Sequence, residues 1–77
     1  MRVLVITDEK HLSVADVLVE GDVLFVTGTA AGIRREFGVP AFKLDDGINI
    51  NANGLPLAGI DNELVTAVLK SDSVIFL

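Results

Sequence analysis

The chain has 77 residues, which is enough for one domain (residues 1–77) and too few for two. Its formal net charge is −5 and its six basic residues are scattered, so we expect no nucleic-acid partner and no binding to an anionic membrane through a basic face. The absence of cysteine excludes both a disulfide framework and a thiolate metal site.

The first predicted strand is the continuous apolar run 3–6, and residues 23–26 repeat the pattern. Continuous rather than alternating apolarity indicates strands buried on both faces, as in a parallel sheet. The first run is too short to cross a membrane and lacks the features of a signal peptide, so we expect a cytoplasmic protein with no membrane partner. Between the runs, Ser13 can cap a short helix, and the alternative is a hairpin turning at residues 20–22. We favour the helix because it gives a regular alternation of strand and helix.

The clearest predicted helix covers residues 30–37, directly after the second strand. Thr29 can cap it, and Ile33 and Phe37 lie on one face of it. A glycine and a proline follow at once and end the helix. The next apolar run, residues 39–44, is the third predicted strand.

Residues 47–59 have a different pattern, in which asparagine alternates with apolar residues. This is the period of a half-buried strand, and Asn53-Gly54 predicts a hairpin turn after it. Pro56 confines the short return strand to a sheet edge. We therefore expect a short hairpin appended to the main sheet.

The last predicted helix begins at Asp61, which can cap it, and ends at Lys70. Its buried stripe is expected to contain Leu64, Val65, Val68 and Leu69. A fourth strand, residues 74–77, ends the sequence. Together these elements predict a compact α/β domain of two or three layers, with a four-stranded, mostly parallel sheet, about three helices and the appended hairpin.

Carboxylates follow two of the predicted strands, and ligands of parallel sheets bind outside the carboxyl ends of the strands. The candidate metal ligands are Asp8, Glu9, Asp45, Asp46 and Asn49. Carboxylate and amide oxygens suit a hard divalent cation, Ca²⁺ ahead of Mg²⁺, and a cation-binding domain is our first functional hypothesis. Two alternatives stay open: the acids can simply start turns, and a shared ion requires the first and third strands to be neighbours.

The sequence Thr27-Gly28-Thr29 stands where the second strand passes into the next helix. Free backbone N–H groups and the helix dipole favour a phosphate at such a junction, so weak phosphate or nucleotide binding is a third hypothesis. The alternative is a tight turn with close packing of helix against sheet.

The 51% hydrophobic content is high for so short a chain. Large exposed apolar patches are uncommon on monomers, so our second hypothesis is a homo-oligomeric interaction module with no small-molecule ligand. Enzymatic activity is not favoured, because the sequence offers no recognisable combination of nucleophile, base and oxyanion site.

With an acid after the first strand, Asp8, the layout resembles a flavodoxin-like or receiver-like α/β domain. It lacks the fifth strand and the lysine position of receivers, so no phosphoacceptor role is carried over to Asp8. Over the whole chain the sequence also resembles small uncharacterised α/β proteins of methanogenic archaea. That resemblance implies an archaeal, thermophilic source and assigns no site residue.

Overall fold

Parallel strands of two to five residues form the centre of the molecule. The computed structural model describes residues 1–32, 36–44 and 55–77, with the backbone alone at positions 60 and 61. Within these ranges the strands are β1 (Arg2–Ile6), β2 (Val23–Val26), β3 (Ala41–Leu44), β4 (Leu57–Ala58) and β5 (Ser73–Phe76). They form one sheet in the order β4-β3-β2-β1-β5, and every neighbouring pair is parallel. β2 is therefore the middle strand, β1 and β3 flank it, and β4 and β5 are the edges.

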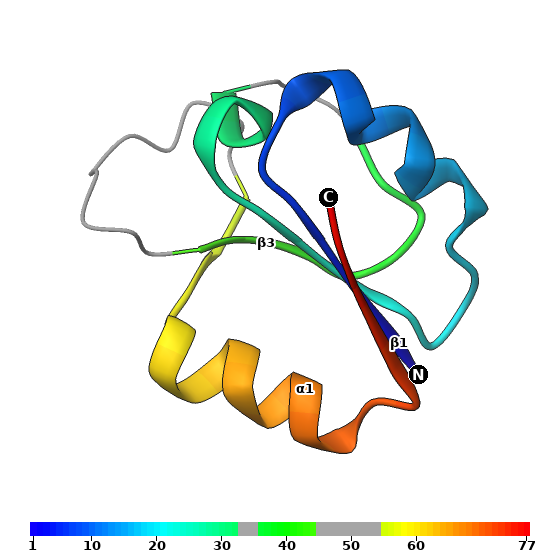
Figure 1. Cartoon of the computed structure of the whole chain (residues 1–77), viewed down its shortest axis with the longest axis vertical. Helices are drawn as coiled ribbons and strands as arrows, with labels where there is room; N and C mark the ends of the chain where they lie inside the picture. The colour runs from blue at the N-terminus through cyan, green and yellow to red at the C-terminus, as the bar shows by residue number, and fades with distance from the viewer. Residues whose placement is uncertain (33–35, 45–54) are drawn as a thin grey trace.

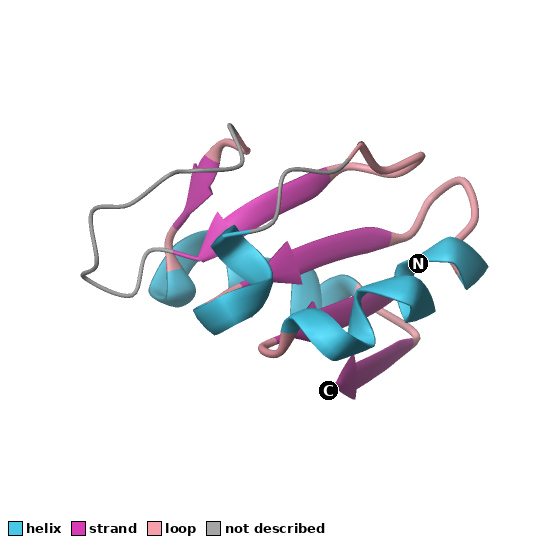
Figure 2. Cartoon of the chain, turned by 90° about the horizontal axis from the view of Figure 1, so that it is seen from above, coloured by secondary structure: helices cyan, strands magenta, loops and turns pink. Residues whose placement is uncertain are grey.

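Helical segments cover both faces of the sheet, which gives three layers (Figures 1 and 2). The 3₁₀ segments η1 (Glu9–Val17) and η2 (Gly28–Gly32) lie on one face. The π-helical turn η3 (Ile60–Leu64) and the helix α1 (Val65–Lys70) lie on the other face. We call these the η1 face and the α1 face.

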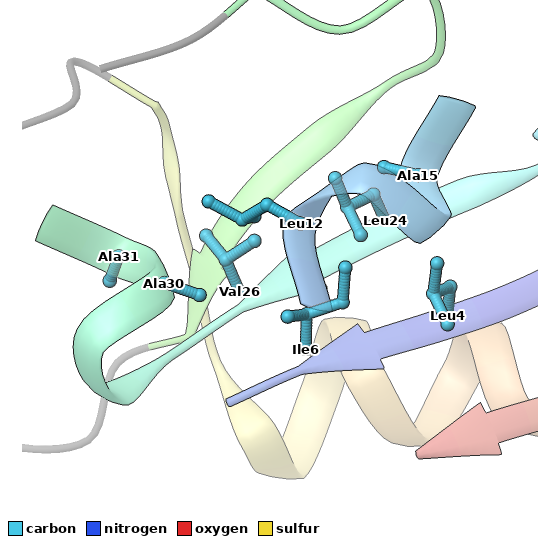
Figure 3. Packing of buried hydrophobic residues seen from close by; sticks show 8 residues of the cluster. All are labelled: Leu4, Ile6, Leu12, Ala15, Leu24, Val26, Ala30 and Ala31. Atoms are coloured by element: carbon cyan, nitrogen blue, oxygen red, sulfur yellow. The ribbon is translucent and has the colours of Figure 1, made fainter. Parts of the chain in front are cut away.

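Each face of the sheet contributes to its own apolar cluster, because alternate residues of a strand point to opposite faces. On the η1 face, Leu4, Ile6, Leu24 and Val26 pack with residues of η1 and η2, as Figure 3 shows. On the α1 face, the cluster consists of Val3, Val5, Phe25, Leu44, Ala58 and Leu64. The rings of Phe25 and Phe42 stack with their centroids 5.7 Å apart. The continuous apolar pattern of β1 and β2 thus predicts their two-sided burial correctly.

The predicted four-stranded sheet with about three helices and a hairpin is wrong. Residues 57–58 do not return along an antiparallel partner but pair in parallel with β3, with Lys43 opposite Leu57. The backbone N–H of Lys43 also donates to the carbonyl of Pro56 at 3.0 Å, so the segment extends the main sheet as a fifth strand. Pro56 still lies at an edge, as expected for a residue without an N–H donor. The turn at Asn53-Gly54 lies outside the described residues.

The helical segments also differ from the prediction in their type and bounds. η1 begins at Glu9 with Asp8 as its cap, not at Ser13, although a helical connection rather than a hairpin does join β1 to β2. η2 already includes Thr29, and Phe37 is not helical. Of the described residues, only 65–70 form an α-helix.

The predicted buried stripe of the last helix is only half correct. Leu64 is buried and Val68 is half-buried, but Val65 and Leu69 are exposed, Leu69 to 81%. α1 lies alone on its part of the sheet, so only the side that faces β1 and Phe25 is covered. The apolar periodicity of the sequence gives the helix correctly but extends beyond the surface that the sheet can bury.

Candidate functional site

The carboxyl edge of the sheet contains two of the predicted metal ligands, Asp8 and Glu9, just after β1. The Oδ1 atom of Asp8 accepts a hydrogen bond from the Lys10 backbone N–H at 3.1 Å and so caps η1. Its Oδ2 atom lies 3.8 Å from Lys10 Nζ. Glu9 is exposed, and its backbone N–H donates to Thr29 Oγ1 at 3.0 Å. Asp8 therefore already has a structural role at the start of a helix.

The strand order does not meet the condition for an ion shared between the first and third strands. β2 lies between β1 and β3, so the ends of these two strands are about 10 Å apart at the usual strand spacing. Asp45, Asp46 and Asn49, the remaining predicted ligands, lie outside the described residues. Within the described ranges, no three His, Asp or Glu side chains are grouped so that they could hold a metal ion. Ca²⁺ or Mg²⁺ binding stays a prediction.

A cation titration tests that prediction directly. If the acidic edge binds Ca²⁺ or Mg²⁺ weakly, amide NMR resonances of residues 7–11 and 45–49 should shift together as the ion reaches millimolar concentration. The matched control is Glu20→Gln, which removes an exposed carboxylate elsewhere on the chain and should leave the shifts unchanged. Resonances that do not move, or that move equally around Glu20, would end the cation hypothesis.

The predicted phosphate-binding residues Thr27, Gly28 and Thr29 are engaged with the neighbouring strand. The Thr27 N–H donates to the carbonyl of Ile6 at 3.0 Å, and Thr29 accepts from Glu9 as described. Gly28 has a φ of +59°, and a Cβ built on it would lie 2.5 Å from the Thr7 carbonyl oxygen. These contacts agree with the alternative of a tight turn packed closely on the sheet. Phosphate binding stays untested.

Lys43, near the end of β3, is a buried polar residue that the sequence reasoning did not single out. Only 3% of its surface is exposed, and its Nζ atom donates to the carbonyl of Leu44 at 3.4 Å. It lies on the η1 face, opposite Val26 of β2. A lysine inside the apolar run 39–44 was the available signal, because charged residues are rarely buried without interaction partners.

An apolar groove of about 440 Å³ lies on the α1 face, beside α1 and over β2 and β3. Phe25 and Phe42 line it from the sheet, and Thr66, Ala67 and Lys70 line it from α1. The groove therefore identifies which side of α1 is turned toward the middle of the sheet.

Exposed apolar side chains also occur on the side of α1 away from the groove and on both faces of β5. Val65 and Leu69 do not line the groove, and they are one turn apart on the helix. Ile75 and Phe76 of β5 are 44% and 66% exposed, although the continuous run 74–77 predicts a buried strand. The reason is that β5 is an edge strand with a neighbour on one side only. We call Val65, Leu69, Ile75 and Phe76 the β5 border.

Comparisons with protein-family models, curated proteins and solved structures give no match. No helix within the described ranges has both the length and the apolar character needed to cross a membrane. Any functional assignment therefore has to come from the residues of this chain, and among the described residues the β5 border is a feature that the fold leaves unexplained.

Proposed function

We propose that the chain is an interaction module that assembles with copies of itself. The observation that carries this proposal is the β5 border, where four large apolar side chains are exposed on two adjacent elements. Single exposed apolar residues are common on protein surfaces, but four of them on two elements that follow each other in the chain favour a binding surface.

Two further observations support a protein partner over a small ligand. The border is built from an edge strand and one side of a helix, and none of its residues lines the groove, whereas small-molecule sites are concave. β2 separates Asp8 and Glu9, which follow β1, from the end of β3. The acidic edge therefore offers less support for a cation site than the sequence suggested. Homo-oligomers with a two-fold axis are the commonest assemblies of soluble chains, which favours a second copy as the partner.

Sedimentation equilibrium from micromolar to millimolar chain concentration tests the proposal. We expect an average mass that rises above the 8.2 kDa of the monomer as the concentration increases. The variant Leu69→Asp should shift this rise to higher concentration, because it places a charge in the apolar β5 border. Leu69 makes little contact within the monomer, so the fold should not change. The matched control Val19→Asp changes an exposed apolar residue away from the border and should behave as the wild type. A strictly monomeric chain at millimolar concentration would contradict the proposal.

A further inference from the structure

The backbone of β5 has unpaired hydrogen-bonding groups on its outer side. The Leu77 N–H donates to the Val5 carbonyl at 2.8 Å, and the Leu77 carbonyl accepts from the Thr7 N–H at 2.9 Å, so the backbone groups of Leu77 point toward β1. Backbone groups of successive strand residues point to opposite sides in alternation. The N–H and C=O groups of Val74 and Phe76 therefore point away from β1, toward the open edge.

This edge lacks the features by which proteins usually block strand pairing. Exposed edges are commonly interrupted by proline, charged side chains or bulges. β5 has the sequence Ser-Val-Ile-Phe and contains none of these. The opposite edge differs, because β4 has only two residues and follows directly after Pro56.

The exposed side chains of β5 make this edge apolar on both faces of the sheet. Val74 packs in the cluster under α1, so Phe76, two residues later, also lies on the α1 face. On that face, Phe76 lies on the side of α1 away from the groove, which is also the side of Leu69. Ile75 lies on the η1 face, opposite Leu4 of β1. The apolar surface of the strand therefore runs from Val74 to Phe76 and occupies both faces.

We infer that two copies of the chain pair through β5, antiparallel about a two-fold axis at Ile75, so that their two sheets become one continuous sheet. This inference rests on the proposed self-association and specifies its interface. With the axis at Ile75, Val74 of each copy lies opposite Phe76 of the other. Each such pair exchanges both of its outward N–H and C=O groups.

Self-association requires an interface that keeps the like charges of the two copies apart, and this edge meets that requirement. The chain has a net charge of −5, so two copies repel each other over most of their surfaces. β5 has no charged side chain, and the two-fold pairing places Ile75 beside Ile75, Val74 beside Phe76 and Ser73 beside Leu77. The two α1 helices would also run antiparallel across the axis, so their dipoles would not repel each other.

Disulfide trapping tests the register, because the chain has no cysteine of its own. Ile75 faces its own copy across the axis in a non-hydrogen-bonded pair, where the Cα atoms are about 4.5 Å apart and within disulfide range. Under mild oxidation we expect Ile75→Cys to form a covalent dimer rapidly. The matched control is Leu57→Cys, a half-exposed residue on the other edge, which should cross-link only at the rate of random collision.

A charge on the edge gives an independent test. Phe76→Lys places two like charges beside the axis, and we expect the dimer dissociation constant to rise at least about tenfold. The control Val19→Lys adds the same charge away from the border and should leave the constant unchanged, and circular dichroism should show the same fold for both variants. If the wild type self-associates but Ile75→Cys cross-links no faster than Leu57→Cys, the β5 pairing is wrong and self-association stands. If the wild type is monomeric at millimolar concentration, both proposals fail.

Discussion

Replacing Gly28 with alanine is expected to lower the free energy of unfolding by roughly 2–4 kcal/mol. Gly28 has a φ of +59°, which costs an alanine about 1 kcal/mol or more. In addition, the new Cβ would lie 2.5 Å from the carbonyl oxygen of Thr7, which is backbone and cannot rotate away. The end of β1 or the turn after β2 must shift, and both are tied together at Thr27 and Thr29.

Two other glycines separate these two contributions. Gly21 has a φ of +93° but no atom within 4 Å of a built Cβ, so Gly21→Ala should show the backbone cost alone. Gly32 has neither a positive φ nor a close neighbour, and Gly32→Ala should change stability by less than about 0.5 kcal/mol. Urea unfolding followed by circular dichroism measures all three. Equal losses for Gly28→Ala and Gly21→Ala would show that the contact with Thr7 does not constrain the fold.

The sequence predicts the strands well where burial is two-sided and poorly where it depends on neighbours. β1 and β2 are surrounded on both faces and at both sides, and their continuous apolar runs indicate this correctly. The run 74–77 has the same pattern, yet Phe76 is exposed because β5 has no outer neighbour. Strand order is a long-range property that no local pattern records. For the same reason, the Asn53-Gly54 signal predicts a hairpin, whereas β4 pairs in parallel with β3.

The candidate site shows the same division between local and long-range information. The sequence identifies Asp8 and Glu9 as carboxylates after a strand, and the structure places them there. Sequence alone cannot tell that β2 separates them from β3, because that fact also depends on strand order. The β5 border combines residues of α1 and β5, and its exposure depends on which side of α1 the sheet covers. Periodicity gives the spacing of Val65 and Leu69 but not the width of the surface beneath them.

Asp22 is the second residue whose replacement should have a large effect, and its sequence position suggested only a turn. Just 3% of its surface is exposed. Its Oδ2 atom accepts hydrogen bonds from Arg2 Nη2 at 2.7 Å, Arg2 Nε at 3.1 Å and the Val19 N–H at 2.9 Å. Its Oδ1 atom accepts from the Arg2 backbone N–H at 3.0 Å. The carboxylate thus joins β1 to the chain that enters β2.

These hydrogen bonds make stability depend on pH through Asp22. The side-chain hydrogen bonds from Arg2, then the N–H of Val19, hold the pKa of the Asp22 carboxyl well below its ordinary value. A carboxyl with a lowered pKa in the folded state stabilises the fold above its unfolded pKa of about 4, and the stabilisation is lost progressively as the pH falls below about 5. The melting temperature of the wild type should therefore be steady near neutral pH and fall in acid.

Asp22→Asn isolates this contribution and should lower the melting temperature at pH 7 by roughly 10 °C. The amide places an NH₂ group against donors of Arg2 or Val19, so at least one buried hydrogen bond becomes a donor–donor contact. The difference from the wild type should shrink between about pH 5 and pH 2, because the wild-type carboxylate is then losing its charge. Asp72→Asn is the control: Asp72 also has a lowered pKa, from its 2.8 Å pair with the terminal amine, but it is exposed and should matter little. A difference that stays constant with pH would show that Asp22 acts through its shape rather than its charge.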